Sequence, residues 1–186
     1  MKTSQEITGQ IQQVKKLVES KYKSEIILNA NGGNSILIVC PPEQEQAYIK
    51  ISRKILSDEK YDFIDINKLL IEFIEKHKEE ILSKLYLLQS SLNQVFKSPP
   101  GEENTDLFNC IIERIEESFK SGKVPFLFSV GSLYGTGIDN IQIIEHEKVM
   151  NANSPLVVLY PAINTENKLL FLNSRPASQY RCMVIK

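Results

Sequence analysis

The feature that most constrains the fold is an uninterrupted apolar run, SILIVC at Ser35–Cys40, which ends at Pro41–Pro42. Such a run is typical of a strand covered on both faces, because a half-exposed strand would alternate apolar and polar residues. Residues 43–60 then show helical spacing, and residues 61–67 (YDFIDIN) form a second strand-like run. Strand, helix and strand within about thirty residues form a βαβ unit, which predicts parallel strands and a right-handed crossover.

The first helical pattern precedes this unit. Residues 1–23 carry apolar side chains at three- and four-residue intervals, which predicts an amphipathic helix, with Ser4 as its N-cap. EIILNA at residues 25–30 reads as a short strand that ends at the turn residues NGGN. Residues 67–97 are helical, and the wholly polar stretch at His77–Glu80 predicts a turn between two antiparallel helices.

The second half of the chain alternates helices and strands in the same way. Residues 98–104 (SPPGEEN) form an internal loop, and residues 106–121 form a helix. Two further buried strands follow, VPFLFSV at residues 124–130 and SPLVVLYPA, which we expect to stop at Pro161. Two edge strands, expected to be antiparallel, close the chain at Lys168–Asn173 and Tyr180–Ile185.

These elements predict one fold class. We expect an α/β fold in which residues 1–186 form a single domain, since this length suits one hydrophobic core. A mostly parallel sheet has helices on both faces and an antiparallel C-terminal edge.

Composition excludes several classes of protein. The formal net charge of −1 gives no electrostatic footprint for duplex DNA. The sequence has no apolar run of the roughly 20 residues that span a membrane, and no signal-peptide pattern at its start, so we expect a cytoplasmic protein. Cys40, Cys110 and Cys182 are dispersed and are interpreted as buried thiols. With only two histidines, we predict neither a metal site nor a cofactor.

The strongest candidate for ligand binding is the glycine-rich connection GSLYGTG. It follows a predicted parallel strand at its carboxyl end, where open α/β sheets bind ligands. Its backbone N–H groups could form a nest for a phosphate or carboxylate, although the spacing matches neither a Walker A loop nor GxGxxG. The alternative is a flexible βα loop whose glycines allow unusual dihedral angles. The ligand-binding residues on the first interpretation are Gly131, Ser132, Gly135, Thr136 and Gly137.

The usual position of a P-loop, after the first buried strand, reads Cys40-Pro-Pro-Glu-Gln-Glu. Prolines remove backbone donors and glutamates repel phosphate, so nucleotide binding there is disfavoured. No GxSxG motif surrounds a serine. Asp62 and Asp65 have a spacing shared by catalytic carboxylates and by ordinary strand ends; a nuclease with a divalent ion is the weaker interpretation. We find no catalytic set and predict that the protein is not an enzyme.

The C-terminal segment carries residue types that dominate protein interfaces, because they combine broad contact area with hydrogen bonding. Tyr160, Tyr180 and Arg181 are the predicted interaction residues. The alternative is that Tyr180 packs on the sheet and Arg181 pairs locally with an acid.

In order along the chain, three blocks resemble the BrxB-like family of bacteriophage-exclusion (BREX) defence systems. The first is SILIVCPPEQEQAYIKISRKIL with YDFIDINKLLIEFIEK; the second is VPFLFSVGSLYGTGID; the third is PLVVLYPA with LLFLN and QYRCMVI. Ala162 stands where the family favours glycine, and GTGID replaces a family pattern that contains arginine.

The resemblance implies a non-catalytic adaptor or scaffold subunit that works through protein–protein contacts. The partners it implies are an alkaline-phosphatase-like PglZ protein, a large AAA-type ATPase and a DNA methyltransferase. It supplies no catalytic residue.

Overall fold

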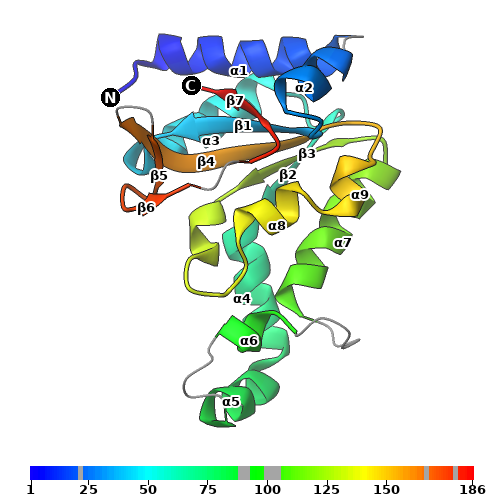
Figure 1. Ribbon diagram of the computed structural model, residues 1–186, viewed down its shortest axis with the longest axis vertical. Coiled ribbons are helices and arrows are strands. Elements are labelled where there is room, and N and C mark those ends of the chain that lie inside the picture. Colours follow the sequence, from blue (N-terminus) through cyan, green and yellow to red (C-terminus); the bar gives the residue numbers. More distant parts are fainter. Residues whose placement is uncertain (21–22, 88–92, 99–105, 166–167, 178–179) are drawn as a thin grey trace.

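A mainly parallel β-sheet organises the structure, a computed structural model that describes residues 1–20, 23–87, 93–98, 106–165, 168–177 and 180–186 (Figure 1). Five strands are hydrogen-bonded side by side in the order β2-β3-β4-β1-β7, and β5 and β6 extend from β4. Their bounds are β1 (Ser35–Cys40), β2 (Tyr61–Asp65), β3 (Val124–Phe128), β4 (Leu156–Thr165), β5 (Lys168–Phe171), β6 (Arg175–Pro176) and β7 (Met183–Ile185). The α/β fold with a mostly parallel sheet is therefore confirmed.

β1 lies between two strands and is buried along its whole length, as its apolar run predicts. It pairs in parallel with β4, from Ser35 opposite Leu156 to Cys40 opposite Pro161. β2 is parallel as well but is not the neighbour of β1, because β3 and β4 lie between them. The β1–helix–β2 unit thus crosses over two strands that come later in the chain.

The C-terminal strands differ from one another in direction. β4 and β5 form the expected antiparallel pair. β7 pairs with β1 in parallel, so the prediction of an antiparallel strand there is wrong. β4 also continues through Pro161 to Thr165, contrary to the expected stop. The strand tolerates Pro161 because its pairing with β3 has already ended at Val158. The Pro161 carbonyl still accepts the N–H of Leu172 at 2.9 Å.

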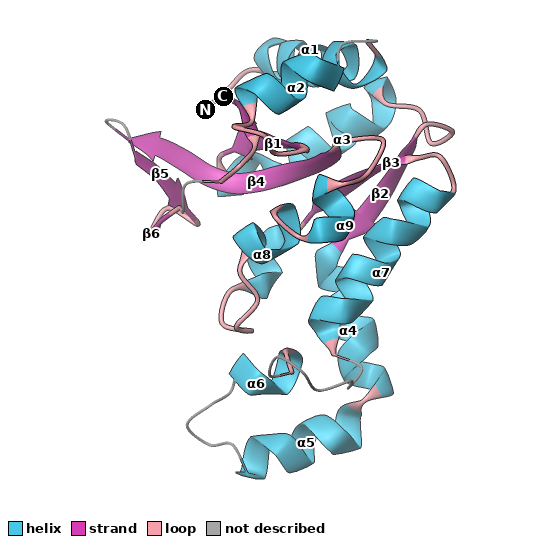
Figure 2. Cartoon of the chain, turned by 45° about the vertical axis from the view of Figure 1, so that its right-hand side comes forward, coloured by secondary structure: helices cyan, strands magenta, loops and turns pink. Residues whose placement is uncertain are grey.

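Helices cover both faces of the sheet (Figures 1 and 2). One face carries α1, α2 and α3, and the other carries α4, α7, α8 and α9. Short 3₁₀ turns follow two strands, η1 after β1 and η2 after β3. The helix bounds are α1 (Ser4–Glu19), α2 (Lys23–Asn29), η1 (Pro42–Gln44), α3 (Glu45–Ile55), α4 (Ile66–Lys76), α5 (Lys78–Leu87), α6 (Asn93–Phe96), α7 (Leu107–Lys120), η2 (Val130–Leu133), α8 (Asn140–Ile144) and α9 (Glu147–Met150).

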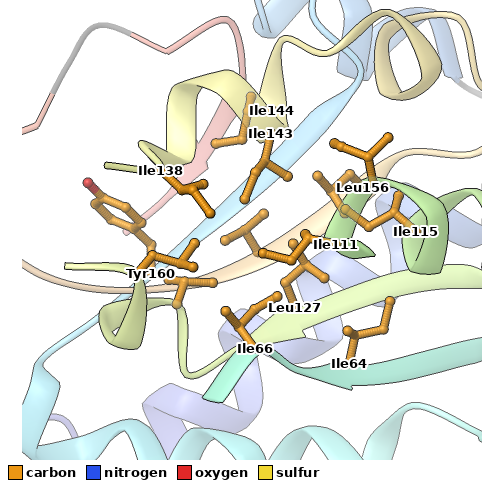
Figure 3. Packing of buried hydrophobic residues seen from close by; sticks show 14 of the residues in the cluster. Ile64, Ile66, Ile111, Ile115, Leu127, Ile138, Ile143, Ile144, Leu156 and Tyr160 are labelled. Atoms are coloured by element: carbon orange, nitrogen blue, oxygen red, sulfur yellow. The ribbon is translucent and has the colours of Figure 1, made fainter. Parts of the chain in front are cut away.

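Each face has its own apolar core. The core under α1 and α3 includes Ile11, Tyr48 and Ile38. The core on the other face joins α7, β3 and β4 through residues such as Ile111 and Leu127 (Figure 3). Burying a side chain of this size contributes about 1.5–3 kcal/mol. Two filled cores explain why the central strands carry no polar face.

The N-terminal elements correct two predictions. The N-cap of α1 is Thr3 rather than Ser4, because Thr3 and Glu6 form a reciprocal capping box. Residues 25–30 belong to helix α2 and its end, not to a strand. Asn31 (φ 50°) and Gly32 (φ 83°) close this helix, and the Gly32 N–H donates to Ile27 O at 2.9 Å. This is the bond of a Schellman motif.

The long helical stretch does divide where polar residues predict it. α4 ends at Lys76, and α5 begins at Lys78 after the C-cap His77. α5 lies beyond the end of α4 rather than alongside it (Figure 2), so the two are not an antiparallel pair. Asp106 caps α7 by accepting the Asn109 N–H at 2.7 Å. Residues 99–104 of the predicted loop lie outside the described residues.

Candidate functional site

The glycine-rich segment leaves the carboxyl end of β3 through a strained turn. Ser129 has left-handed backbone angles (φ 56°), and its N–H donates to Glu45 Oε1 at 2.9 Å. The chain then forms η2 and reaches Gly135 (φ 86°) and Gly137 (φ 81°). Both glycines occupy conformations that side chains disfavour. The sequence places them there because the chain must turn twice before α8.

The polar groups of this segment bond mostly to one another. Ser132 Oγ donates to Ser129 O at 2.8 Å, and the Tyr134 N–H donates to Gly131 O at 3.1 Å. Thr136 is buried; its hydroxyl donates to Leu133 O at 2.7 Å and accepts the Ile138 N–H at 3.2 Å. These groups therefore hold the shape of the segment. Binding of a phosphate by Ser132 or Thr136 stays a prediction.

Three aromatic rings, from β4, β5 and the segment before β7, line the same cavity as the glycines. Tyr160 is 1% exposed and stacks on Phe171 with ring centroids 4.9 Å apart. The Tyr180 ring meets the Tyr160 ring edge-on, and their hydroxyl oxygens are 2.7 Å apart. Burial and the hydrogen bond with Tyr180 raise the pKa of Tyr160 above the ordinary tyrosine value, so the hydroxyl stays protonated at neutral pH.

A cavity of about 550 Å³ lies between these two groups, and we call it the aromatic cavity. Its size is in the range of small-ligand sites. Tyr160 lies at its inner wall, beside Ile138 (Figure 3). The residues that line it are Leu133, Tyr134, Gly135, Gly137, Ile138, Asp139, Asn140, Tyr160, Phe171, Arg175, Pro176, Ala177 and Tyr180.

The structure thus joins two sets of residues that the sequence suggested separately. Gly135 and Gly137, predicted for ligand binding, line the same cavity as Tyr160 and Tyr180, predicted for interaction. Gly131 lies elsewhere, packed on the hairpin: a Cβ added there would lie 3.1 Å from the Leu172 side chain.

Two charged residues at the cavity were missed by the sequence analysis. The Arg175 guanidinium lies 5.3 Å from the centroid of the Tyr134 ring, which is 57% exposed. Among the described residues, Arg175 has no carboxylate within ion-pair distance. Asp139, just before α8, supplies the opposite charge. A sequence signal existed for Arg175, since it lies just after the edge strand predicted at Lys168–Asn173.

Arg181 lies outside the aromatic cavity. Its backbone N–H donates to Glu145 Oε1 at 3.2 Å, and its Nε donates to Asn31 O at 3.4 Å. Its own carbonyl lies so close to Gly33 that a Cβ there would be only 1.7 Å away. Arg181 therefore ties the segment before β7 to the turn before β1. The alternative interpretation paired its side chain with an acid, but the guanidinium bonds to a backbone carbonyl and only the backbone N–H reaches a carboxylate.

The two aspartates considered for a nuclease hold different structural bonds. Asp62 Oδ2 is 2.7 Å from Arg114 and 2.6 Å from the Ser118 hydroxyl, both on α7. Burial alone would raise the pKa of Asp62, but the hydrogen bonds from Arg114 and Ser118 outweigh it and hold that pKa below the ordinary value. Asp65 instead caps α4 by accepting the Asn67 N–H at 3.0 Å. The two carboxylates thus bond to different helices, Asp62 to α7 and Asp65 to the start of α4.

The cysteines and histidines also occupy structural positions. Cys40 and Cys182 are buried free thiols, and burial raises the pKa of Cys182 to about 12; Cys110 is only half-buried. His146 caps α9 by accepting the Lys148 N–H at 3.2 Å, and burial lowers its pKa. Within the described ranges, no three His, Cys, Asp or Glu side chains gather as metal ligands. In the same part of the chain, no helix has the length and apolarity to cross a membrane.

Comparison with known proteins adds no relative: no protein-family model, no curated protein and no solved structure matches the chain.

Proposed function

We propose that this protein is a non-catalytic adaptor that binds partner proteins through the aromatic cavity and its rim. The observation that carries the proposal is the pairing of an exposed Tyr134 with Arg175, a cation without an ion-pair partner in the described residues, over a buried aromatic wall. Tyrosine and arginine are enriched among the few residues that dominate the binding energy of protein interfaces. Asp62 holds α7 and Asp65 caps α4, so each has a structural role.

The resemblance to the BrxB-like family suggests which proteins are bound. The proposed partners are a PglZ-like protein of alkaline-phosphatase fold, a large AAA-type ATPase and a DNA methyltransferase, in a cytoplasmic phage-defence complex. A planar side chain of a partner would fit the aromatic cavity, because aromatic rings stack on tyrosine rings and are attracted to arginine guanidinium groups.

Co-purification tests this proposal. The chain is expressed with the neighbouring genes and captured by a tag, as wild type and as Tyr134→Ala and Arg175→Ala. Both variants should reduce partner recovery at least fivefold, since removing such residues typically costs more than about 1 kcal/mol of binding. The control is Tyr86→Ala on α5, because Tyr86 is 77% exposed and lies outside the cavity. Partner-free behaviour of the wild-type chain, or an equal loss in the control, would refute the proposal.

A second candidate function is binding of a nucleotide or phosphate by the segment Gly131–Gly137. It is favoured by the cavity volume and by the fact that Arg175, Gly135 and Gly137 line the same cavity. A ligand at about one hundred times its dissociation constant adds about 2.7 kcal/mol of stability. Thermal unfolding with a panel of millimolar nucleotides measures this, and Arg175→Ala should remove the gain. The absence of any shift would eliminate this function.

A further inference from the structure

β2 forms one edge of the sheet, and its outer side is open. The strand pairs only with β3, and α3 and α7 lie on either side of it (Figure 2). Edge strands are commonly protected by lysine, proline or a bulge, because unpaired backbone groups attract other strands. The sequence of β2, YDFID, has neither lysine nor proline, and its two aspartates bond to α7 and to the start of α4.

The hydrogen bonds around β2 show which backbone groups face outward. Val124 N–H donates to Lys60 O at 2.8 Å, so Lys60 faces β3. Backbone groups alternate between the two sides of a strand, so those of Tyr61 and Phe63 face away from β3. The Tyr61 N–H agrees, because it donates to Ser57 O at 2.9 Å. Among the described residues, none bonds to the outward N–H and C=O of Phe63.

A cleft of about 300 Å³ lies along this edge. It is lined by three consecutive residues of β2 and by charged side chains from α3, α4 and α7. The residues are Arg53, Phe63, Ile64, Asp65, Lys68, Leu69, Glu72, Arg114 and Phe128. The hollow therefore lies beside the C-terminal three residues of the strand. An added strand would lie about 4.8 Å from β2 there.

One cation of the cleft, Arg53, favours an acidic occupant. The carboxylate of Asp65, which also lines the cleft, accepts backbone N–H bonds at the start of α4. Arg114 is paired with Asp62, and Lys68 lies 3.5 Å from Glu72. Arg53 has no carboxylate within ion-pair distance among the described residues; its guanidinium lies 4.8 Å from the centroid of the Phe63 ring. Residues directly opposite on neighbouring strands share a face of the sheet. A carboxylate opposite Phe63 would thus meet Arg53.

We infer that the open edge of β2 binds an extended acidic segment of a partner protein by strand addition. Main-chain hydrogen bonds to Phe63 supply affinity, and the Arg53 guanidinium selects an acidic residue opposite it. This site is separate from the aromatic cavity, because the two share no lining residue.

The test uses the full chain and synthetic peptides of about eight residues that alternate valine and glutamate. One matched peptide carries glutamine in place of glutamate. Two other peptides carry N-methyl groups on alternate residues. One is methylated at the odd positions and the other at the even positions. The acidic peptide should bind and slow hydrogen exchange at the Phe63 amide. One of these two peptides should not bind and the other should, because only every second N–H group of the peptide faces β2.

A protein variant tests the charge. Arg53→Gln should weaken binding of the acidic peptide about threefold and leave the glutamine peptide unchanged. Lys50→Gln is the control, because it removes the same charge from an exposed position of α3 outside the cleft. Equal binding of the acidic and neutral peptides, no binding of the acidic peptide at millimolar concentration, or self-association of the chain through β2 would each overturn the inference.

Discussion

The carboxyl ends of β1 and β3 lie at the same edge of the sheet but have opposite characters. The end of β1 is closed by the N-terminal segment: Lys2 N–H donates to Gln44 Oε1 at 2.9 Å, and Gln44 Nε2 donates to Lys2 O at 2.8 Å. The end of β3 opens into the aromatic cavity. Parallel α/β sheets bind ligands at carboxyl ends. In this protein the N-terminal segment covers the carboxyl end of β1, and the cavity lies after the carboxyl end of β3.

The largest expected change in the free energy of unfolding is at the inner wall of the aromatic cavity, which follows β3. Tyr160→Ala removes a buried ring that stacks on Phe171, and it should destabilise the fold by about 3–5 kcal/mol. Tyr134→Ala, at the exposed rim, should change stability by less than about 0.5 kcal/mol. Denaturant unfolding measures both. Similar losses in the two variants would show that the rim is structural and would undermine its role in binding.

The next largest loss of stability is expected at the carboxyl end of β1, which the N-terminal segment closes. Gln44→Ala removes both bonds to the Lys2 backbone from a buried position, and it should cost about 1–3 kcal/mol. Hydrogen exchange at the Lys2 amide should become faster at the same time. Gln46→Ala is the matched control, because Gln46 is exposed on the following turn. If exchange at Lys2 does not change, the clamp does not hold the N-terminal segment.

Two glycine-to-alanine substitutions should change the free energy of unfolding in opposite directions. Gly135→Ala has open space for the added carbon, but φ is 86°, so left-handed strain should cost about 1 kcal/mol. Gly9→Ala also meets no atom within 4 Å but lies inside α1, so it should stabilise the chain by about 1 kcal/mol. Thermal unfolding separates them. Stabilisation by Gly135→Ala would mean that the turn at the open end is not strained.

The smallest effect is a pH dependence at the strand next to the open end. The pKa of Asp62 is lower in the folded chain, so its contribution to stability is present above the ordinary aspartate pKa of about 4. That contribution is lost as pH falls through the folded value. Asp62→Asn should cost less than about 1 kcal/mol at neutral pH and nothing in strong acid. A difference that persists at low pH would assign the effect to packing.

Local signals predicted the elements well, because burial and capping act within a few residues. The run at Ser35–Cys40 is a buried strand, and Asp106 and Gly122 bound α7 as their chemistry suggests. The same signals misread residues 25–30, where Ile26 is buried and Leu28 is 79% exposed, a pattern that a helix produces. The turn residues Asn31 and Gly32 end a helix, although they would also be suitable after a strand.

Strand order and the candidate site were beyond local signals. Gly135 and Tyr160 meet because β3 and β4 are neighbours, and no short-range pattern fixes that adjacency. Arg175 reaches Tyr134 only through the antiparallel hairpin that carries β6. The sequence could name the residue types of the site, but their convergence depends on which strands pair.

The place of β1 between β4 and β7 also bears on how the chain acquires its shape during synthesis. Ser35 pairs with Leu156, and Ile36 pairs with Met183. A growing chain leaves the ribosome at about 5–20 residues per second. β1 is therefore synthesised several seconds before β4 and β7, and during that time its apolar side chains are exposed to aggregation or bound by chaperones. Removal of β7 would leave one edge of β1 without a neighbouring strand.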